Sequence, residues 1–112
     1  MSISTQTVLL RHLQAASLGV EAVMADYADT SVVITDDRAY HGLTEIRGLF
    51  TELLEGPCRG FVSSFEMARQ EVVGEVAFIV WSAPPWFGHA TDTFVVRDDK
   101  ILVQTFSALL GK

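Results

Sequence analysis

Residues 90–101 read ATDTFVVRDDKI, and this stretch decides the fold class. A strand is predicted from His89 to Arg97, a tight turn at Asp98-Asp99-Lys100, and a second strand from Ile101 to Leu109. Strands joined by so short a turn pair in antiparallel fashion. The C-terminal end of the chain is therefore predicted to be an antiparallel hairpin.

Two more strands are predicted upstream of this hairpin, from Phe61 to Gln70 and from Glu75 to Ala83. Val73-Gly74 and the segment PPWFG at 84–88 connect the strands. Still earlier, the β-branched run SVVIT at 31–35 predicts a strand, and the DDR sequence at 36–38 a turn.

Apolar residues at helical spacing predict three helices in the first half of the chain. The first is closed by Gly19, the second is short, and the third follows Gly42 and ends at Gly56-Pro57. Helices followed by a meander of strands indicate the α+β class. The three apolar stripes are Val8, Leu9, Leu10, Leu13 and Ala16; Val20, Val23, Met24 and Tyr27; and Ile46, Leu49, Phe50, Leu53 and Leu54.

The composition predicts a single domain over residues 1–112 with more apolar surface than its own core needs. Hydrophobic residues make up 49% of the chain and charged residues 20%. A domain this small has much surface to cover, so part of the apolar area is expected to line a cavity or a contact between subunits.

The charge balance argues against several classes of partner. The net charge is -6, from 14 acidic and 8 basic residues without a basic cluster, which disfavours nucleic acid and anionic membranes. The longest apolar run, Val76 to Trp81, is far too short to span a membrane, and no signal peptide is expected. The single cysteine, Cys58, excludes an internal disulfide and leaves the redox compartment open, and a cytoplasmic location is expected by default.

Three segments carry a resemblance to a known family. They are DYAD at 26–29 followed by SVV at 31–33, YHGLTEI at 40–46, and residues 90–101. Their order and spacing resemble the NTF2-like superfamily, which includes ketosteroid isomerases and SnoaL-like cyclases. The resemblance implies a cystatin-like/NTF2-like cone, in which three N-terminal helices pack on a strongly curved antiparallel sheet around an apolar pocket. It does not imply one function, since this fold carries many.

Asp92 is the strongest candidate for a catalytic residue. Strand alternation places it on one face with Ala90, Phe94 and Val96, where burial would raise the pKa of its carboxyl group. The resemblance matches Asp92 to the oxyanion-hole aspartate of ketosteroid isomerases. The alternative is an aspartate that pairs with a neighbour or lies at a solvated pocket edge.

The other two isomerase positions match less well. The general base falls on Thr35, so Asp36 just beyond it is the candidate base, or else a turn residue. The oxyanion-binding tyrosine falls on His12, which either donates or shuttles protons or is simply a packed or solvated residue. With one match in three, a true ketosteroid isomerase is not expected.

The same alternation predicts which side chains line the pocket and which face away from it. Ile79, Trp81 and Val103 are expected on the outer sheet face, where a homodimer would cover them. Trp86 and Phe87 form either a pocket lip or a plug. The predicted ligand-binding residues are Phe50, Phe78, Val80, Ser82, Phe94, Gln104 and Phe106.

Two functions remain open. The first is a small-molecule pocket protein that performs acid–base catalysis, isomerase- or lyase-like, on an apolar carbonyl-type substrate. The second is a non-catalytic ligand-binding or dimerisation domain. No cofactor is expected, because the sequence has no phosphate loop or dinucleotide motif. No metal site is expected either, because His12, His41 and His89 lack ligand spacing.

Overall fold

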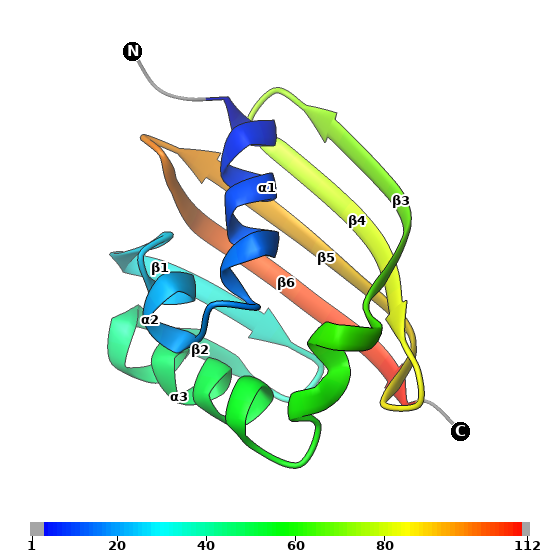
Figure 1. Ribbon diagram of the computed structural model, residues 1–112. Coiled ribbons are helices and arrows are strands. Elements are labelled where there is room, and N and C mark those ends of the chain that lie inside the picture. Colours follow the sequence, from blue (N-terminus) through cyan, green and yellow to red (C-terminus); the bar gives the residue numbers. More distant parts are fainter. Residues whose placement is uncertain (1–3, 111–112) are drawn as a thin grey trace.

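A six-stranded sheet in the order β2-β1-β6-β5-β4-β3 forms one side of the molecule in the computed structural model, which describes residues 4–110 (Figure 1). All neighbouring strands are antiparallel except β1 and β6, which run parallel, so the expected antiparallel sheet is in fact mixed. The strands are β1 (Tyr27–Thr35), β2 (Ala39–His41), β3 (Glu66–Val73), β4 (Val76–Ala83), β5 (Phe87–Arg97) and β6 (Lys100–Leu110).

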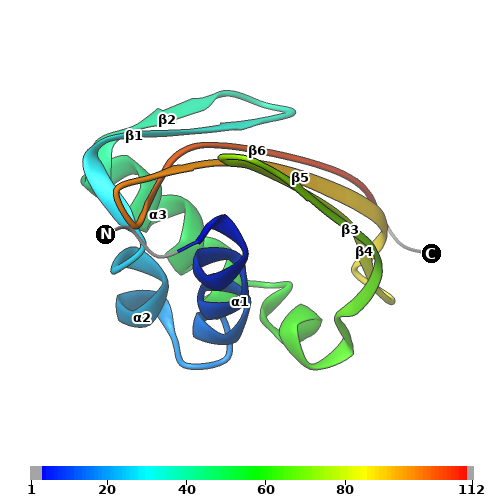
Figure 2. The ribbon, with the colours of Figure 1, turned by 90° about the horizontal axis from the view of Figure 1, so that it is seen from above.

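The helices all lie on the concave face of this sheet, which curves around them (Figure 2). They are α1 (Thr5–Ala15), α2 (Val20–Met24) and α3 (Gly42–Glu55), followed by a 3-10 helix, η1 (Arg59–Ser64). The opposite face of the sheet carries no helix (Figure 2). The α+β prediction is confirmed, and no helix within residues 4–110 is long and apolar enough to cross a membrane.

The 3-10 helix η1 replaces the first residues of the strand expected from Phe61, so residues 4–110 contain four helices rather than three. The hydroxyl groups of Ser63 and Ser64 donate to the carbonyl oxygens of Gly60 and Phe61. Such local bonds compete with pairing in a sheet. The strand begins only at Glu66, after this turn of helix.

The predicted hairpin of β5 and β6 is present, with Arg97 opposite Lys100. Asp98 and Asp99 between them have φ angles of 53° and 65°. A two-residue turn of this kind suits aspartate, which tolerates the left-handed region, and its twist matches that of the strands. The turn fixes the register of the two strands that carry the polar groups described below.

Candidate functional site

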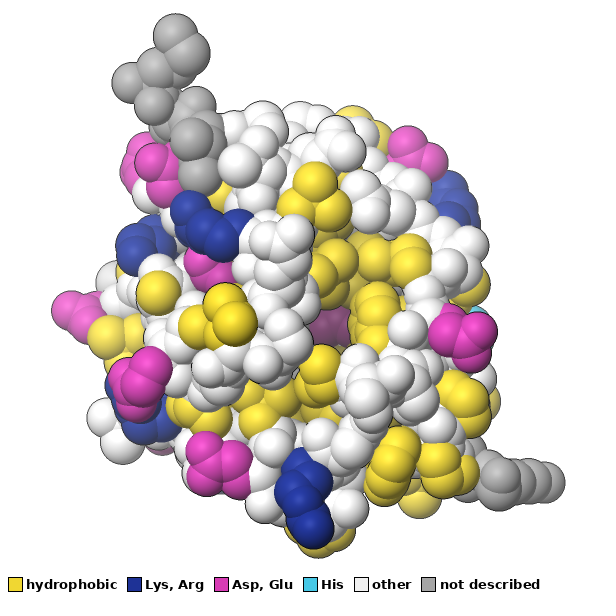
Figure 3. All heavy atoms as spheres, viewed as in Figure 1, with side chains coloured by type: hydrophobic (Ala, Val, Ile, Leu, Met, Phe, Trp, Pro, Cys, Tyr) yellow, Lys and Arg dark blue, Asp and Glu magenta, His cyan; other side chains and the backbone are white. Residues whose placement is uncertain are grey.

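A cavity of about 260 Å³ lies between the concave face of the sheet and the helices. Figure 3 shows its opening, rimmed by hydrophobic side chains, with an acidic side chain visible at the bottom. Since a single water molecule needs only ~15 Å³ measured in this way, the cavity has room for a small organic molecule. Its lining residues are His12, Leu13, Ala16, Ser17, Val23, Val33, Leu49, Phe50, Leu53, Leu54, Phe61, Val62, Phe65, Ile79, Trp81, Phe87, Asp92, Phe94, Gln104 and Phe106.

Asp92 is the one acidic residue among these lining residues, and its side chain is held by two donors. Trp81 Nε1 donates to Oδ1 at 2.7 Å, and Gln104 Nε2 donates to Oδ2 at 2.8 Å. Burial raises the pKa of Asp92 to about 6, although these two hydrogen bonds and the nearby His12 oppose the rise. A carboxyl group at the bottom of an apolar cavity therefore changes its charge near neutral pH.

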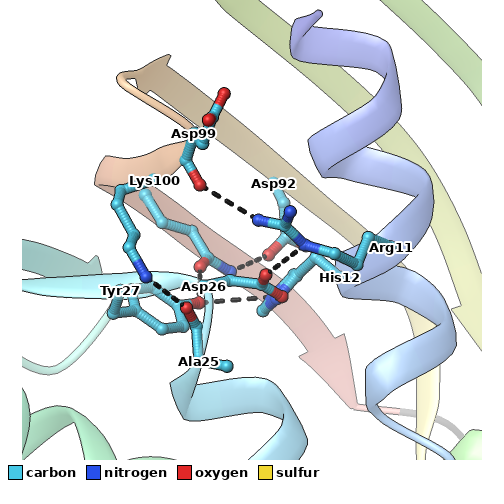
Figure 4. A network of polar contacts seen from close by, with 9 residues as sticks. Arg11, His12, Ala25, Asp26, Tyr27, Asp92, Asp99 and Lys100 are labelled. Carbon is cyan, nitrogen blue, oxygen red and sulfur yellow. Dashed lines mark hydrogen bonds and ion pairs between the residues drawn. The ribbon is translucent and has the colours of Figure 1, made fainter. Parts of the chain in front are cut away.

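The hydrogen bonds continue from Asp92 toward the N-terminal helix. The Tyr27 hydroxyl donates to Gln104 Oε1 and lies 3.3 Å from His12 Nε2. His12 Nδ1 in turn lies 3.0 Å from Asp26 Oδ2 (Figure 4). We call Asp26, His12, Tyr27, Gln104 and Asp92 the polar chain.

Charged groups at the outer end of the polar chain keep Asp26 ionised. Burial alone would raise the pKa of Asp26, but His12 and Arg11 together lower it below its ordinary value. Arg11 Nε donates to Asp26 Oδ1 at 2.7 Å and its guanidinium also reaches the carbonyl oxygen of Asp99 (Figure 4). Burial, with Asp92 and Asp26 nearby, raises the pKa of Tyr27 well above its ordinary value, so this phenol stays neutral.

The register of the strands explains why these groups meet. Phe94 lies opposite Gln104 and Asp92 opposite Ile79, so the inward-facing residues of β4, β5 and β6 form adjacent rows. In α1, His12 shares the buried stripe with Val8, which turns its ring toward the sheet. Helix α1 and strands β4, β5 and β6 thus direct His12, Trp81, Asp92 and Gln104 into the same cavity.

No family model and no curated protein matches this sequence. Solved structures do match. An NTF-2 like protein of unknown function from Burkholderia xenovorans LB400 superposes with a TM-score of 0.75 at 18% identity, over 96% of this chain and 84% of that one. A SnoaL-like protein of unknown function from Burkholderia thailandensis gives a TM-score of 0.74 at 13% identity, over 94% of each chain.

A third structure, a Nostoc punctiforme protein with a cystatin-like fold, gives a TM-score of 0.66 at 13% identity over 97% of this chain and 96% of that one. The protein has the NTF2-like fold. This confirms the fold implied by the sequence resemblance, including the helices packed into a curved sheet. At these identities the likeness extends to the fold alone.

Six of the residues predicted for the site line the cavity of this NTF2-like fold. They comprise both polar and aromatic side chains from α1, α3, β5 and β6. The six are His12, Phe50, Asp92, Phe94, Gln104 and Phe106.

The predicted orientation of β4 is wrong by one residue. Ile79 and Trp81 face the cavity, whereas Phe78, Val80 and Ser82 lie on the outer face and do not line it. Strand β4 reads VAFIVWSA and is apolar on both faces, so period-two alternation does not reveal which face points inward. Trp81 is only 5% exposed, so it cannot be the outer dimer contact that the sequence suggested.

Asp36 does not line the cavity, so the prediction that it is the base of the site is wrong. It is exposed, and its carboxylate accepts hydrogen bonds from Ser107 Oγ at 2.8 Å and from the backbone N–H of Ala108 at 3.2 Å. Asp36 instead joins the end of β1 to β6, in keeping with the turn role considered for it.

The two aromatic residues Trp86 and Phe87, where the β4–β5 connection leads into β5, have different surroundings. Phe87 is buried and lines the cavity. Trp86 is not among the lining residues, and its ring lies against Gly60 of η1, where a Cβ atom would approach it to 2.6 Å. Phe87 is thus part of the cavity wall, and Trp86 packs the β4–β5 connection against η1.

Sequence reasoning missed Asp26 and Tyr27 as site residues. The sequence pattern puts Tyr27 on an apolar helical stripe, and Asp26 belongs to the segment DYAD at 26–29 that carries the family resemblance. The available signal is an aspartate directly before β1, but the partner of Asp26, His12, lies 14 residues upstream. Among residues 4–110 no cluster of three or more His, Cys, Asp or Glu side chains could hold a metal ion.

Proposed function

We propose that the protein binds a small, largely apolar molecule in the cavity and uses Asp92 to transfer a proton on it, in an isomerase- or lyase-like reaction of a carbonyl-type substrate. The observation that carries this proposal is the position of Asp92. It is 5% exposed, lines an otherwise mostly apolar cavity, and has a pKa raised to about 6. A general base works best when its pKa lies near the operating pH.

The hydrogen bonds of Asp92 favour a role as proton acceptor over the oxyanion donor expected from the resemblance. Both of its oxygens accept N–H donors, from Trp81 and Gln104, which suits the ionised carboxylate. These donors also fix the carboxylate relative to the aromatic wall. A C–H group of a bound molecule, made acidic by an adjacent carbonyl, would meet the remaining lone pairs of Asp92.

Exchange of hydrogen for deuterium tests this function without knowledge of the natural substrate. Small cyclic ketones such as cyclohexanone and 3-cyclohexenone are incubated with the protein in D₂O, and loss of the C–H signal next to the carbonyl is followed by NMR. We expect saturable exchange whose rate rises with pH through about 6, as Asp92 ionises. Saturable binding of the ketones without exchange would instead identify a non-catalytic ligand-binding domain.

We also propose that the outer face of the sheet is a contact between two copies of this chain. This face carries Val80, Val95 and Val103 and lacks a covering helix (Figure 2). Val76, Val103 and Ile34 are 41%, 37% and 45% exposed, so apolar side chains from three strands of this face meet water in a single chain.

Val103→Glu is therefore expected to dissociate a dimer, because it places a charge in the middle of this face. Sedimentation velocity at micromolar concentration measures the effect. Leu18→Glu is the matched control, since Leu18 is 77% exposed on the helical side and its change should leave the mass unchanged. A monomeric wild-type protein would refute the contact.

A further inference from the structure

The hydrogen bonds from His12 to Asp92 all point the same way, because each group between them donates to one neighbour and accepts from the other. A glutamine amide nitrogen only donates and its oxygen only accepts, and a tyrosine hydroxyl has one hydrogen to donate. Gln104 Nε2 donates to Asp92 and Gln104 Oε1 accepts from Tyr27. The Tyr27 oxygen is then left to accept from His12 Nε2, 3.3 Å away.

This direction assigns two protons to His12. Nε2 carries one, because the Tyr27 hydrogen is already directed at Gln104. Nδ1 carries the other, because it faces the carboxylate of Asp26, which only accepts. In this first arrangement Asp92 is an anion and His12 a cation.

A second arrangement fits the same atom positions. If the Gln104 amide turns by half a revolution, its oxygen accepts from a protonated Asp92 and its nitrogen donates to Tyr27. Tyr27 then donates to His12 Nε2, which has lost its proton, while Nδ1 still donates to Asp26. The number of protons and the net charge are the same in both arrangements, so they differ only in whether His12 or Asp92 holds one proton.

We propose that Asp92 and His12 share a single proton through Gln104 and Tyr27, and that the contents of the cavity decide which of the two residues holds it. Both Asp92 and His12 line the cavity, so whatever fills it contacts the two ends of this shared-proton system. Water there stabilises the ion pair. A wholly apolar molecule such as toluene, which lacks the carbonyl group of the proposed substrate, removes that water and favours the neutral pair, since buried charges lose hydration.

The neighbouring charged groups do not take part in the sharing of the proton between Asp92 and His12. Asp26 is held ionised by Arg11 in both arrangements, and the nearby Lys100 ammonium donates to the carbonyl oxygen of Ala25 rather than to the polar chain. The other rings in contact with His12 are Phe50 of α3 and Phe94 of β5, which carry no charge. The proposal rests on the role of Asp92 as the proton acceptor of the cavity, and it makes Gln104 and Tyr27 positioning residues for that role.

Nitrogen-15 NMR of His12 tests the proposal, because protonated and unprotonated ring nitrogens resonate far apart. Asp92→Asn should hold the second arrangement, with its amide donating to Gln104. At a fixed pH of about 7, the ratio of Nε2-protonated to unprotonated His12 is then expected to fall about tenfold, the effect of losing one hydrogen bond to a charged group.

Tyr27→Phe distinguishes coupling through the hydrogen bonds of the polar chain from simple electrostatic attraction between Asp92 and His12. It removes one oxygen atom and interrupts the polar chain, but it leaves Asp92 at the same distance from His12. In this background Asp92→Asn should change the His12 ratio less than threefold, whereas an equal change in both backgrounds would overturn the proposal. If Tyr27→Phe fails to fold, Gln104→Met interrupts the polar chain at its other link and takes its place.

Saturation of the wild-type solution with toluene provides the second test. Toluene should move the His12 Nε2 signal toward the unprotonated position in the wild-type protein and not in Tyr27→Phe. The NMR lines of toluene itself show whether it is bound. If it is bound and the wild-type His12 signal does not change, the cavity contents do not decide which residue holds the proton. Neither measurement needs turnover, so loss of the ketone exchange reaction and loss of this coupling are separate outcomes.

Discussion

Asp92→Asn is expected to lower the rate of ketone exchange by about 10²–10⁴-fold, the usual contribution of a positioned acid or base, and to make the protein more stable at pH 8. An asparagine keeps the shape of the side chain. Its oxygen can still accept from Trp81, and its amide can still bind a turned Gln104. Activity and stability should therefore change in opposite directions, as expected where a buried charge serves function.

The size and sign of the stability change follow from the raised pKa of Asp92. Its ordinary value of 3.8 applies in the unfolded chain, and burial raises the pKa to about 6 in the folded state. The folded state therefore binds the proton more tightly, and the stability that this provides is complete below pH 4 and lost as pH rises through about 6. At about 1.4 kcal/mol per pKa unit, the loss by pH 8 amounts to about 3 kcal/mol.

Urea unfolding of both proteins between pH 4 and pH 8 measures this difference. The free energy of unfolding of Asp92→Asn should exceed that of the wild type by up to about 3 kcal/mol at pH 8, and the difference should disappear toward pH 4. Asp36→Asn is the matched control, since the same chemical change at an exposed carboxyl group should alter stability by less than about 1 kcal/mol and leave exchange unchanged. A difference independent of pH would contradict the burial of an ionisable Asp92.

The C-terminal hairpin is predictable because the side chains of the two strand faces differ in type along its sequence. In β5, the inward residues Asp92 and Phe94 alternate with Thr91 and Thr93, and a two-residue Asp turn fixes the partner strand. The neighbouring β4 has no such alternation of polar and apolar residues. Its sequence therefore predicts a strand but does not indicate which face of the strand points into the cavity. Whether a uniformly apolar strand turns one face or the other inward depends on its partners, which single-sequence patterns do not contain.

The polar chain was only half predictable for a related reason. Asp92 and His12 were identifiable as polar residues within apolar patterns, and both line the cavity. Their connection was not, because it passes through Tyr27 and Gln104, 77 residues apart in the sequence. Contacts between residues so distant in the chain depend on the packing of α1 and β1 against the sheet, and no local spacing indicates them.

Asp26→Ala is expected to lower the free energy of unfolding by about 3–5 kcal/mol, the usual result of removing one partner of a buried ion pair. The side chain of Asp26 is 2% exposed and that of His12 is 7% exposed. Without the carboxylate, His12 Nδ1 loses its hydrogen-bond acceptor inside the protein, and in the arrangement with a protonated His12 the positive charge also loses its counter-ion. The loss should be greatest near neutral pH and shrink in acid, because the pKa of Asp26 lies below its ordinary 3.8 and its stabilising effect disappears as pH falls through that range.

Arg11→Ala is the control that distinguishes the buried pair from the exposed one. Arg11 binds the same carboxylate at 2.7 Å, but its side chain is 43% exposed, so water replaces much of what the guanidinium provides. Its removal should lower the free energy of unfolding by less than about 1 kcal/mol. Urea unfolding at pH 7 compares the two variants. Equal losses would mean that the Asp26–His12 contact adds no stability beyond the Asp26–Arg11 contact, and that the outer end of the polar chain is held in place by packing rather than by the Asp26 carboxylate.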